Sequence, residues 1–238
     1  TDVRGASMAE DSLILPAFHY FVAGPDTVKM LNSFVLKSKY LYWQKKHKEA
    51  MAVLDSGIAA ATACRDTYLM VNMLSEKANR YVYVEKDYKK AIEAHLRAIA
   101  IREDEGLCYS LGIAMGLQGN DSASYYMDRS IELVEKKKDT TRLVHYLRNY
   151  AQLLSYISSD YKKAAEVSKR LRSLAPDGGQ VAMTDLVLTE CFLKMGELDS
   201  AQYYLDQGRA LLARREKLLS TENMMTYYQG LIDYTRHR

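Results

Sequence analysis

Five short segments of the chain share one layout, and their spacing constrains the fold more than any other feature. In each segment an apolar run with helical spacing is followed by a tight polar turn, and then by an alanine that starts a second apolar run. The alanines are Ala50, Ala91, Ala123, Ala164 and Ala201, so the steps between them are 41, 32, 41 and 37 residues. Steps that average in the high thirties and differ by several residues are typical of stacked helical hairpins whose helices vary in length.

The residues around each alanine fit a hairpin of two antiparallel helices. Alanine is small, so two helices can approach closely where the second one starts. Seven residues after each alanine comes another small or apolar residue, and this spacing places both on one face of a helix. These residues are Gly57, Ala98, Ser130, Leu171 and Gly208. Three residues before the alanine, Tyr88, Tyr161 and Leu198 are suited to fill the wedge at the turn.

Composition excludes the other fold classes. The 238 residues include only 12 glycines and 3 prolines, whereas a β-sandwich or β-barrel needs many glycine and proline turns. Hydrophobic residues make up 48% of the chain, which excludes a disordered protein. The longest apolar stretch, residues 13–24, is interrupted by Pro16 and His19 and is too short to span a bilayer. We therefore expect an all-α fold without a membrane-spanning segment.

The repeated segments resemble the tetratricopeptide repeat (TPR). The most similar copies are Ala78-Asn79 with Asp87-Tyr88 and Ala91, Ala151-Gln152 with Asp160-Tyr161, Ala164 and Pro176, and Met195-Gly196-Glu197-Leu198 with Ala201. The resemblance implies a right-handed superhelical solenoid of antiparallel helix hairpins. The consensus tryptophan of the first helix is absent throughout, and the third unit has a short, glycine-rich first helix at about residues 105–117.

The resemblance divides the chain into three parts. Residues 1–10 are expected to form a tail or loop, and residues 11–26 a partial helical unit. Residues 27–238 are expected to form an array of about five hairpins plus a terminal helix at residues 216–234, with Met225, Tyr228 and Ile232 along one stripe. Pro176 is expected to end the preceding helix, and Asp177-Gly178-Gly179 to form the loop that follows.

A second resemblance, to bacterial envelope repeat proteins, rests on the N-terminal region. The residues that carry it are Asp11-Ser12-Leu13-Ile14, Tyr20-Phe21 and Met30-Leu31. Such proteins are lipid-anchored or linked to a sensor or regulator. Together with a chain that starts at Thr1, this resemblance favours the interaction or sensor portion of a larger bacterial protein, in the cell envelope or periplasm rather than in the cytoplasm.

No residue constellation indicates an enzyme. The five histidines include no pair at i, i+4, and no cysteine pair has metal-ligand spacing, so we expect neither a metal nor a cofactor. Gly112, Gly116 and Gly119 follow a helical stretch rather than a strand, and this favours close helix packing and a repeat turn over a phosphate loop. His95 stands where the repeat places a bulky packing residue, and we expect it to be packed or hydrogen-bonded.

Charge does not favour nucleic-acid binding. The formal net charge is only +3, with both signs interspersed. Residues 37–48 combine lysines with Tyr40, Tyr42 and Trp43 and are the strongest local anomaly. The spacing of Tyr40 and Trp43 is typical of core positions, so we predict that Trp43 is a packing residue and that the neighbouring lysines lie in an exposed turn.

In stacked hairpins the first helices line an inner groove. Counting back from each alanine predicts the groove residues Asn32, Lys39, Tyr42, Glu76, Arg80, Tyr83, Tyr146, Asn149, Tyr156, Glu190 and Lys194, with Leu153 beside them. Tyrosines and amides suit an extended peptide. We therefore predict a non-catalytic scaffold that binds a protein or peptide. The alternatives are an input domain for a signalling enzyme or transcription regulator outside this chain, and a homodimer through the last helix.

Overall fold

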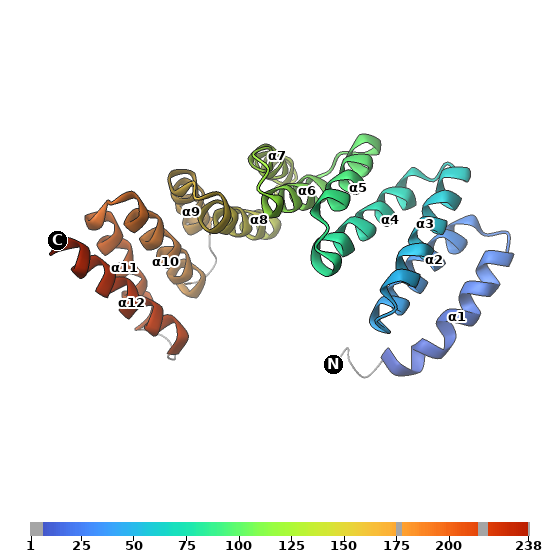
Figure 1. Cartoon of the computed structure of the whole chain (residues 1–238), viewed down its shortest axis with the longest axis horizontal. Helices are drawn as coiled ribbons and strands as arrows, with labels where there is room; N and C mark the ends of the chain where they lie inside the picture. Colours follow the sequence, from blue (N-terminus) through green and yellow to red (C-terminus); the bar gives the residue numbers. More distant parts are fainter. Residues whose placement is uncertain (1–6, 175–177, 214–218, 238) are drawn as a thin grey trace. The chain divides into compact units, whose positions relative to one another are not determined.

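The computed structural model describes residues 7–174, 178–213 and 219–237, and every element in them is helical (Figure 1). The chain divides into two compact units, Thr1–Ala114 and Met115–Arg238. The elements of the first unit are α1 (Ser7–Ala23), α2 (Thr27–Trp43), α3 (His47–Ala63), α4 (Thr67–Arg80), η1 (Tyr81–Glu85) and α5 (Tyr88–Ile101). Helix α6 (Glu105–Gln118) contains the boundary. The second unit contains α7 (Ala123–Lys136), α8 (Thr140–Leu153), η2 (Leu154–Ser158), α9 (Tyr161–Leu174), α10 (Gly178–Met195), α11 (Leu198–Leu212) and α12 (Leu219–Arg236).

Within each unit, helices that follow one another in the chain pack side by side. In the first unit α1 packs on α2, α2 on α3, α3 on α4 and α4 on α5. In the second unit the same order holds from α7 to α12. Where the connecting residues are described, short turns join the helices, and the helices on either side run antiparallel. This arrangement confirms the predicted all-α fold of repeated helix hairpins.

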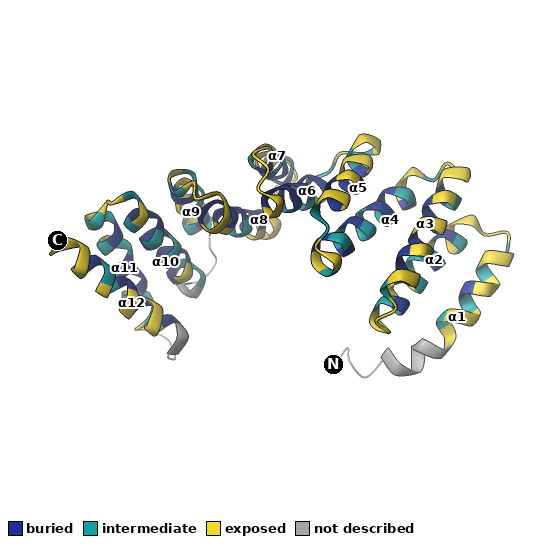
Figure 2. Cartoon of the chain, in the orientation of Figure 1, coloured by how far each residue is buried: buried dark blue, intermediate teal, exposed yellow. Residues whose placement is uncertain are grey.

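The five alanines lie in the hairpin cores, as predicted. Each starts a second helix, and at most 4% of its surface is exposed. The five residues seven positions later are also buried. Figure 2 shows buried residues along the helix faces that pack on neighbouring helices. In the first unit one hydrophobic cluster joins α2, α3 and α4 through Leu31, Leu54 and Leu74.

Aspartates begin many of the helices. The carboxylates of Asp26, Asp66, Asp87, Asp104, Asp139 and Asp160 each accept a hydrogen bond from the backbone N–H three residues later. Such an N-cap satisfies a donor that the helix leaves unpaired. Just before several of these caps, the turns hold a residue with positive φ, for example Arg65, Lys86 and Ser159. The repeated cap and turn explain why the hairpins recur.

Two of the first helices end in a π-helical turn, which adds one residue before the hairpin turn. In the hairpin of α2, the N–H of Lys46 donates to the carbonyl of Leu41, five residues back. After η1 and η2, the N–H groups of Asp87 and Asp160 donate to carbonyls six residues back, those of Tyr81 and Leu154. Each residue of α4 or α8 therefore precedes the alanine of its hairpin by one residue more than the equivalent residue of α2 does.

Both ends of the array differ slightly from the predicted boundaries. Helix α1 begins at Ser7, so residues 7–10, expected in a tail, are helical, while residues 1–6 lie outside the described residues. Helix α12 begins at Leu219, and Met225, Tyr228 and Ile232 are buried along one stripe, as predicted. Pro176, expected to end the helix, and the expected loop residue Asp177 lie outside the described residues, and α9 ends at Leu174, just before them. Gly178 and Gly179, also expected in the loop, already belong to α10.

The prediction that Trp43 packs in the core is wrong. Its side chain is 64% exposed, whereas Tyr40, three residues earlier, is partly buried. Trp43 is the last residue of α2, and Lys45 turns the chain away with a φ of 61°. No further residues of α2 therefore follow Trp43 to cover its indole ring.

Substituting Gly57 by alanine is expected to lower the free energy of unfolding of the first unit by about 1–3 kcal/mol. A Cβ at Gly57 on α3 would lie 2.8 Å from the Cβ of Phe34 and 2.6 Å from the sulfur of Met73. The sulfur can move, but the Cβ of Phe34 is fixed to the backbone of α2, so the two helices must separate. Urea denaturation followed by circular dichroism measures the loss.

Gly230 on α12 provides the matched control. A Cβ there would meet no atom within 4 Å. Replacing Gly230 by alanine removes only the conformational cost of glycine in a helix, so we expect a gain of about 0.5–1 kcal/mol. Equal effects of the two substitutions would contradict the close approach of α2 and α3.

Candidate functional site

In the first unit a polar cavity of about 280 Å³ lies between the first helices of two consecutive hairpins, α2 and α4. Helix α2 contributes Asn32, Val35 and Lys39. Helix α4 contributes a longer, mostly polar row, which consists of Leu69, Asn72, Ser75, Glu76 and Asn79. The cavity thus offers three amide side chains, one cation and one carboxylate to a ligand.

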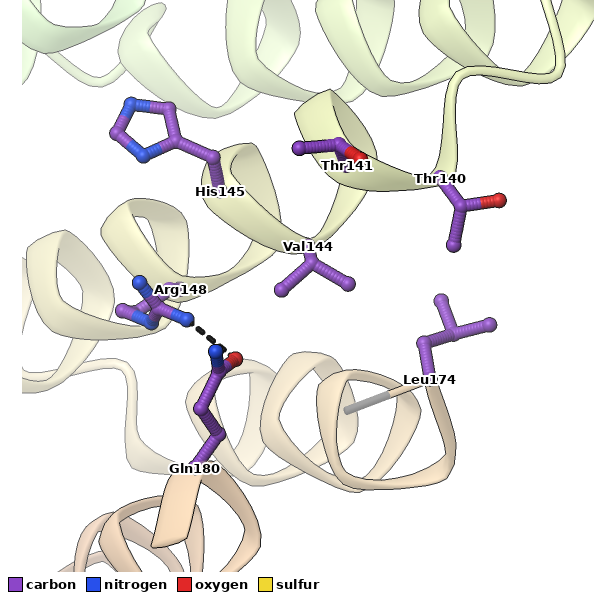
Figure 3. A pocket seen from close by; sticks show the side chains of 7 residues that line it. All are labelled: Thr140, Thr141, Val144, His145, Arg148, Leu174 and Gln180. Carbon is purple, nitrogen blue, oxygen red and sulfur yellow. Dashed lines mark hydrogen bonds between the residues drawn. The ribbon is translucent and has the colours of Figure 1, made fainter. Parts of the chain in front are cut away.

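In the second unit a cavity of about 360 Å³ lies between α8 and α10, closed on one side by the end of α9 (Figure 3). Its lining residues are Thr140, Thr141, Val144, His145, Arg148, Leu174 and Gln180. The Arg148 guanidinium donates a 2.7 Å hydrogen bond to the Gln180 side-chain oxygen and so joins the two helices. Figure 3 shows Val144 and Leu174 as the apolar part of the lining.

The two cavities use equivalent positions of the repeat once the π-helical turns are taken into account. On α2 the lining residues Asn32, Val35 and Lys39 precede Ala50 by 18, 15 and 11 residues. On α4 the residues Asn72, Ser75 and Asn79 precede Ala91 by 19, 16 and 12 residues, one more in each case. His145 and Arg148 on α8 precede Ala164 by 19 and 16 residues. The extra residue is the one that η1 and η2 insert.

Three of the predicted groove residues come together in the α2–α4 cavity: Asn32, Lys39 and Glu76. Two other predictions are corrected by the shift of one residue. Arg80 and Tyr146 are only 6% exposed, so they lie in the core rather than on the groove surface. Leu153, also counted back from Ala164, is buried as well. The residues that occupy the expected positions are Asn79 in place of Arg80 and His145 in place of Tyr146.

Arg80 connects two of the predicted residues from inside the first unit. Its Nη2 donates a 2.8 Å hydrogen bond to Oε1 of Glu76, and its guanidinium lies over the Tyr42 ring at 4.6 Å from the centroid. Tyr42 is partly buried by this contact. Tyr83, in contrast, projects from η1 and is 61% exposed. Tyr42 and Arg80 therefore support the cavity wall, and neither lines the cavity.

Near the C-terminal end of the second unit, two tyrosines approach one carboxylate. The Tyr228 hydroxyl on α12 donates a 3.1 Å hydrogen bond to Oε2 of Glu190 on α10. Burial, together with the Glu190 charge, raises the pKa of Tyr156 to about 12 and also raises that of Tyr228. Both phenols therefore stay protonated at neutral pH. Glu190 is engaged in this cluster, and Lys194, one helical turn later, is exposed.

Asn149 lies beside the α8–α10 cavity without lining it. Its amide nitrogen donates a 2.8 Å hydrogen bond to the backbone carbonyl of His145. The polar lining residues that sequence reasoning missed include Asn72, Ser75, Asn79, His145, Arg148 and Gln180. One signal was present in the spacing, since the two 41-residue steps end at Ala91 and Ala164, the alanines of the two hairpins with π-helical turns.

Within the described ranges, no group of three or more histidine, cysteine, aspartate or glutamate side chains is placed to hold a metal ion. In the same residues, no helix combines the length and the apolar character needed to cross a bilayer.

The sequence matches no protein-family model, and the comparison with curated proteins finds no significant match. Solved structures do match. BtubC (BKLC) from P. vanneervenii is similar with a TM-score of 0.72 and 15% identity, over 92% of this chain and 98% of that chain. YrrB, described as a TPR protein with an unusual peptide-binding site, has a TM-score of 0.64 and 16% identity, over 90% and 98%. The Cut9–Hcn1 heterotetramer of the APC/C has a TM-score of 0.54 and 17% identity, over 96% of this chain and 42% of that chain. The chain therefore has a TPR-like fold.

Proposed function

We propose that the protein is a non-catalytic scaffold that binds an extended segment of a partner protein along the inner face of its first helices. The observation that carries this proposal is the recurrence of the cavity. The α2–α4 and α8–α10 cavities lie in different units, yet residues at equivalent repeat positions line both. Such recurrence suits a ligand chain that contacts successive first helices in the same way.

The chemistry of the lining supports an extended polypeptide as the ligand. Asparagine and glutamine side chains both donate and accept hydrogen bonds, which matches the alternating N–H and C=O groups of an extended backbone. Val35 in one cavity and Leu174 in the other, both partly buried, offer apolar surface to side chains. YrrB, which shares the fold, is described as having a peptide-binding site. The residues lie on helices, so the receptor is largely preformed and little ordering cost falls on it.

Peptide selection tests the proposal. A library of displayed twelve-residue random peptides is selected against the wild-type chain. The selected peptides are then bound to a groove variant, Asn72→Ala/Asn79→Ala/Arg148→Ala. We expect the variant to lose at least about tenfold in affinity, since each removed hydrogen bond contributes roughly 0.5–1.5 kcal/mol. Isothermal titration calorimetry measures the affinities.

A control variant on the second helices, Glu93→Ala/Arg97→Ala/Glu166→Ala, removes exposed side chains that line neither cavity. It is expected to bind the selected peptides as the wild type does, and circular dichroism checks that both variants keep their helical content. Peptides that bind the groove variant normally, or a selection that yields no binder, would contradict the proposal.

Self-association is a second candidate, favoured by the exposed face of α12. Met224, Tyr227 and Tyr234 are exposed there, although the opposite stripe of the helix is buried. If this face joins two copies, the wild-type mass from light scattering is that of a dimer, and Tyr227→Glu/Tyr234→Glu gives a monomer. A monomeric wild type across micromolar concentrations would dismiss this candidate.

The proposed context is the interaction or sensor portion of a larger bacterial protein, or the input domain of a signalling enzyme or transcription regulator. The encoding gene and its flanking sequence test both. An effector domain in the same reading frame supports the input domain, whereas a stop codon directly after Arg238 supports a free-standing adaptor.

A further inference from the structure

The charges around the α2–α4 cavity do not balance. Lys39 and Glu76 are the charged residues among those that line it. The Glu76 carboxylate is already paired, because Arg80 Nη2 lies 2.8 Å from its Oε1. Lys39 is exposed, and within the described residues it forms no ion pair. Arg80 therefore compensates the Glu76 carboxylate from behind the wall, and the positive charge of Lys39 is left over at the cavity.

Arg80 holds the Glu76 carboxylate from behind the cavity wall. Its side chain is only 7% exposed, and its guanidinium is held over the Tyr42 ring. Nε and Nη1 are buried and have no hydrogen-bond partner among the described residues. Buried guanidinium donors are normally satisfied by protein, water or ligand. The pair formed by Arg80 and Glu76 thus keeps unused donor capacity directly behind the cavity wall.

The amide side chains of the cavity point to the same kind of ligand. Asn72 and Asn79 are partly buried in the lining, and no hydrogen bond from either side chain is found in the described part of the chain. Asn32 uses its amide nitrogen on the carbonyl of Val28, at 2.9 Å. Two amide groups and the Lys39 ammonium can therefore donate into one space. An acceptor-rich anion satisfies such donors better than a neutral group, because charge-assisted hydrogen bonds are the stronger ones.

We propose that the α2–α4 cavity binds a side-chain carboxylate, from an aspartate or glutamate of the partner segment. Lys39 forms the ion pair with it, and Asn72 and Asn79 donate hydrogen bonds to it. Arg80 compensates the charge of Glu76, which would otherwise repel the incoming carboxylate. This inference rests on the proposed function and specifies which side chain of the partner the first unit selects.

A positional-scanning peptide library tests it. Each pool fixes one residue type at the centre of a nine-residue random peptide that is acetylated and amidated, so that no terminal carboxylate is present. Binding to the wild type, to Lys39→Gln and to the control Lys48→Gln is measured by fluorescence polarisation. Lys48 is an exposed lysine on α3 that does not line the cavity. Matched pools with a free C-terminus distinguish a side-chain carboxylate from a terminal one.

For the wild type and Lys48→Gln, we expect the glutamate or aspartate pools to bind about five- to tenfold more tightly than the glutamine and asparagine pools. The preference should vanish in Lys39→Gln and weaken with added salt, since Lys39 is exposed. Binding without a preference for acidic pools, or a preference that survives Lys39→Gln, would overturn this inference and leave the peptide-binding proposal standing. A preference found only with free C-termini would assign the site to a terminal carboxylate instead. Absence of binding by every pool would overturn both.

Discussion

Replacing Arg172 by methionine is expected to lower the free energy of unfolding of the second unit by about 3–5 kcal/mol at pH 7, a loss typical of a buried ion pair that loses one partner. The Asp185 side chain on α10 has no exposed surface. Arg172 on α9 donates from Nε to its Oδ1 at 2.6 Å, and from Nη2 toward Oδ2 at 3.5 Å. Methionine keeps the packing of the aliphatic stem but leaves the carboxylate buried without its cation. Urea denaturation, with hydrogen exchange of the α9 and α10 amides, measures the loss.

The reciprocal substitution, Asp185→Asn, is expected to cost clearly less. The Arg172 side chain is 31% exposed, so its guanidinium can still be hydrated when the carboxylate is gone. The cost of breaking the pair is therefore expected to depend on which partner remains. Equal losses from the two substitutions would contradict the assignment of the cost to the buried carboxylate.

The pH dependence of the Arg172→Met loss provides a further check. Burial raises the pKa of Asp185, and its hydrogen bond with Arg172 opposes this rise. Without Arg172 the folded-state pKa rises further above the unfolded value, so the folded state takes up a proton first as the pH falls. The deficit of Arg172→Met relative to the wild type should therefore shrink below neutral pH. A deficit that is constant between pH 7 and pH 5 would contradict this account.

The sequence predicts the fold well because the hairpin depends on local residues. An alanine at the start of each second helix, a second small residue seven positions on, and an aspartate or glycine in the turn act within a few residues of each other. Gly57 shows that such a pattern has a direct structural meaning, since only a glycine allows α2 and α3 to approach this closely. Spacing and composition were sufficient to predict these features.

The candidate site was less predictable, because its residues depend on the helical register over a full helix. One extra residue in η1 moves Asn79 into the cavity and Arg80 into the core. The same insertion in η2 places His145 in the cavity lining and Tyr146 in the core. A π-helical turn is stabilised by the contacts of the whole hairpin, and no single residue type marks it. Counting from the alanine therefore reaches the cavity residues Asn32 and Lys39 on α2, whereas it is one position off at Arg80 on α4 and Tyr146 on α8.

Trp43 illustrates a different limit. Its spacing from Tyr40 is compatible with a core position, but burial depends on how far the helix continues. Trp43 is the last residue of α2, and its side chain is exposed. Periodicity defines the face of a helix on which a residue lies, and the neighbouring elements decide whether that face is covered.

Acidification is expected to destabilise the first unit by about 3 kcal/mol between pH 7 and pH 4, because His95 is buried in a neutral form. The side chain has no exposed surface, and neither ring nitrogen has a hydrogen-bond partner among the described residues. Burial lowers the pKa of His95 from 6.5 to about 4. Since the folded-state pKa is below the unfolded one, the unfolded state binds the proton first as the pH falls through 6.5. Stability is complete above that pH and decreases down to about pH 4.

His95→Leu isolates this effect, since leucine fills a similar volume and does not titrate. The free energy of unfolding of the variant, minus that of the wild type, should be nearly constant above pH 7 and should increase toward acid, by about 3 kcal/mol at pH 4. Other titrating groups cancel in this difference, and hydrogen exchange in the second unit provides an internal reference that should not respond. A difference that is flat from pH 7 to pH 4 would show that His95 gains a partner or water in the folded state. The histidine at this core position would then be hydrogen-bonded rather than only packed.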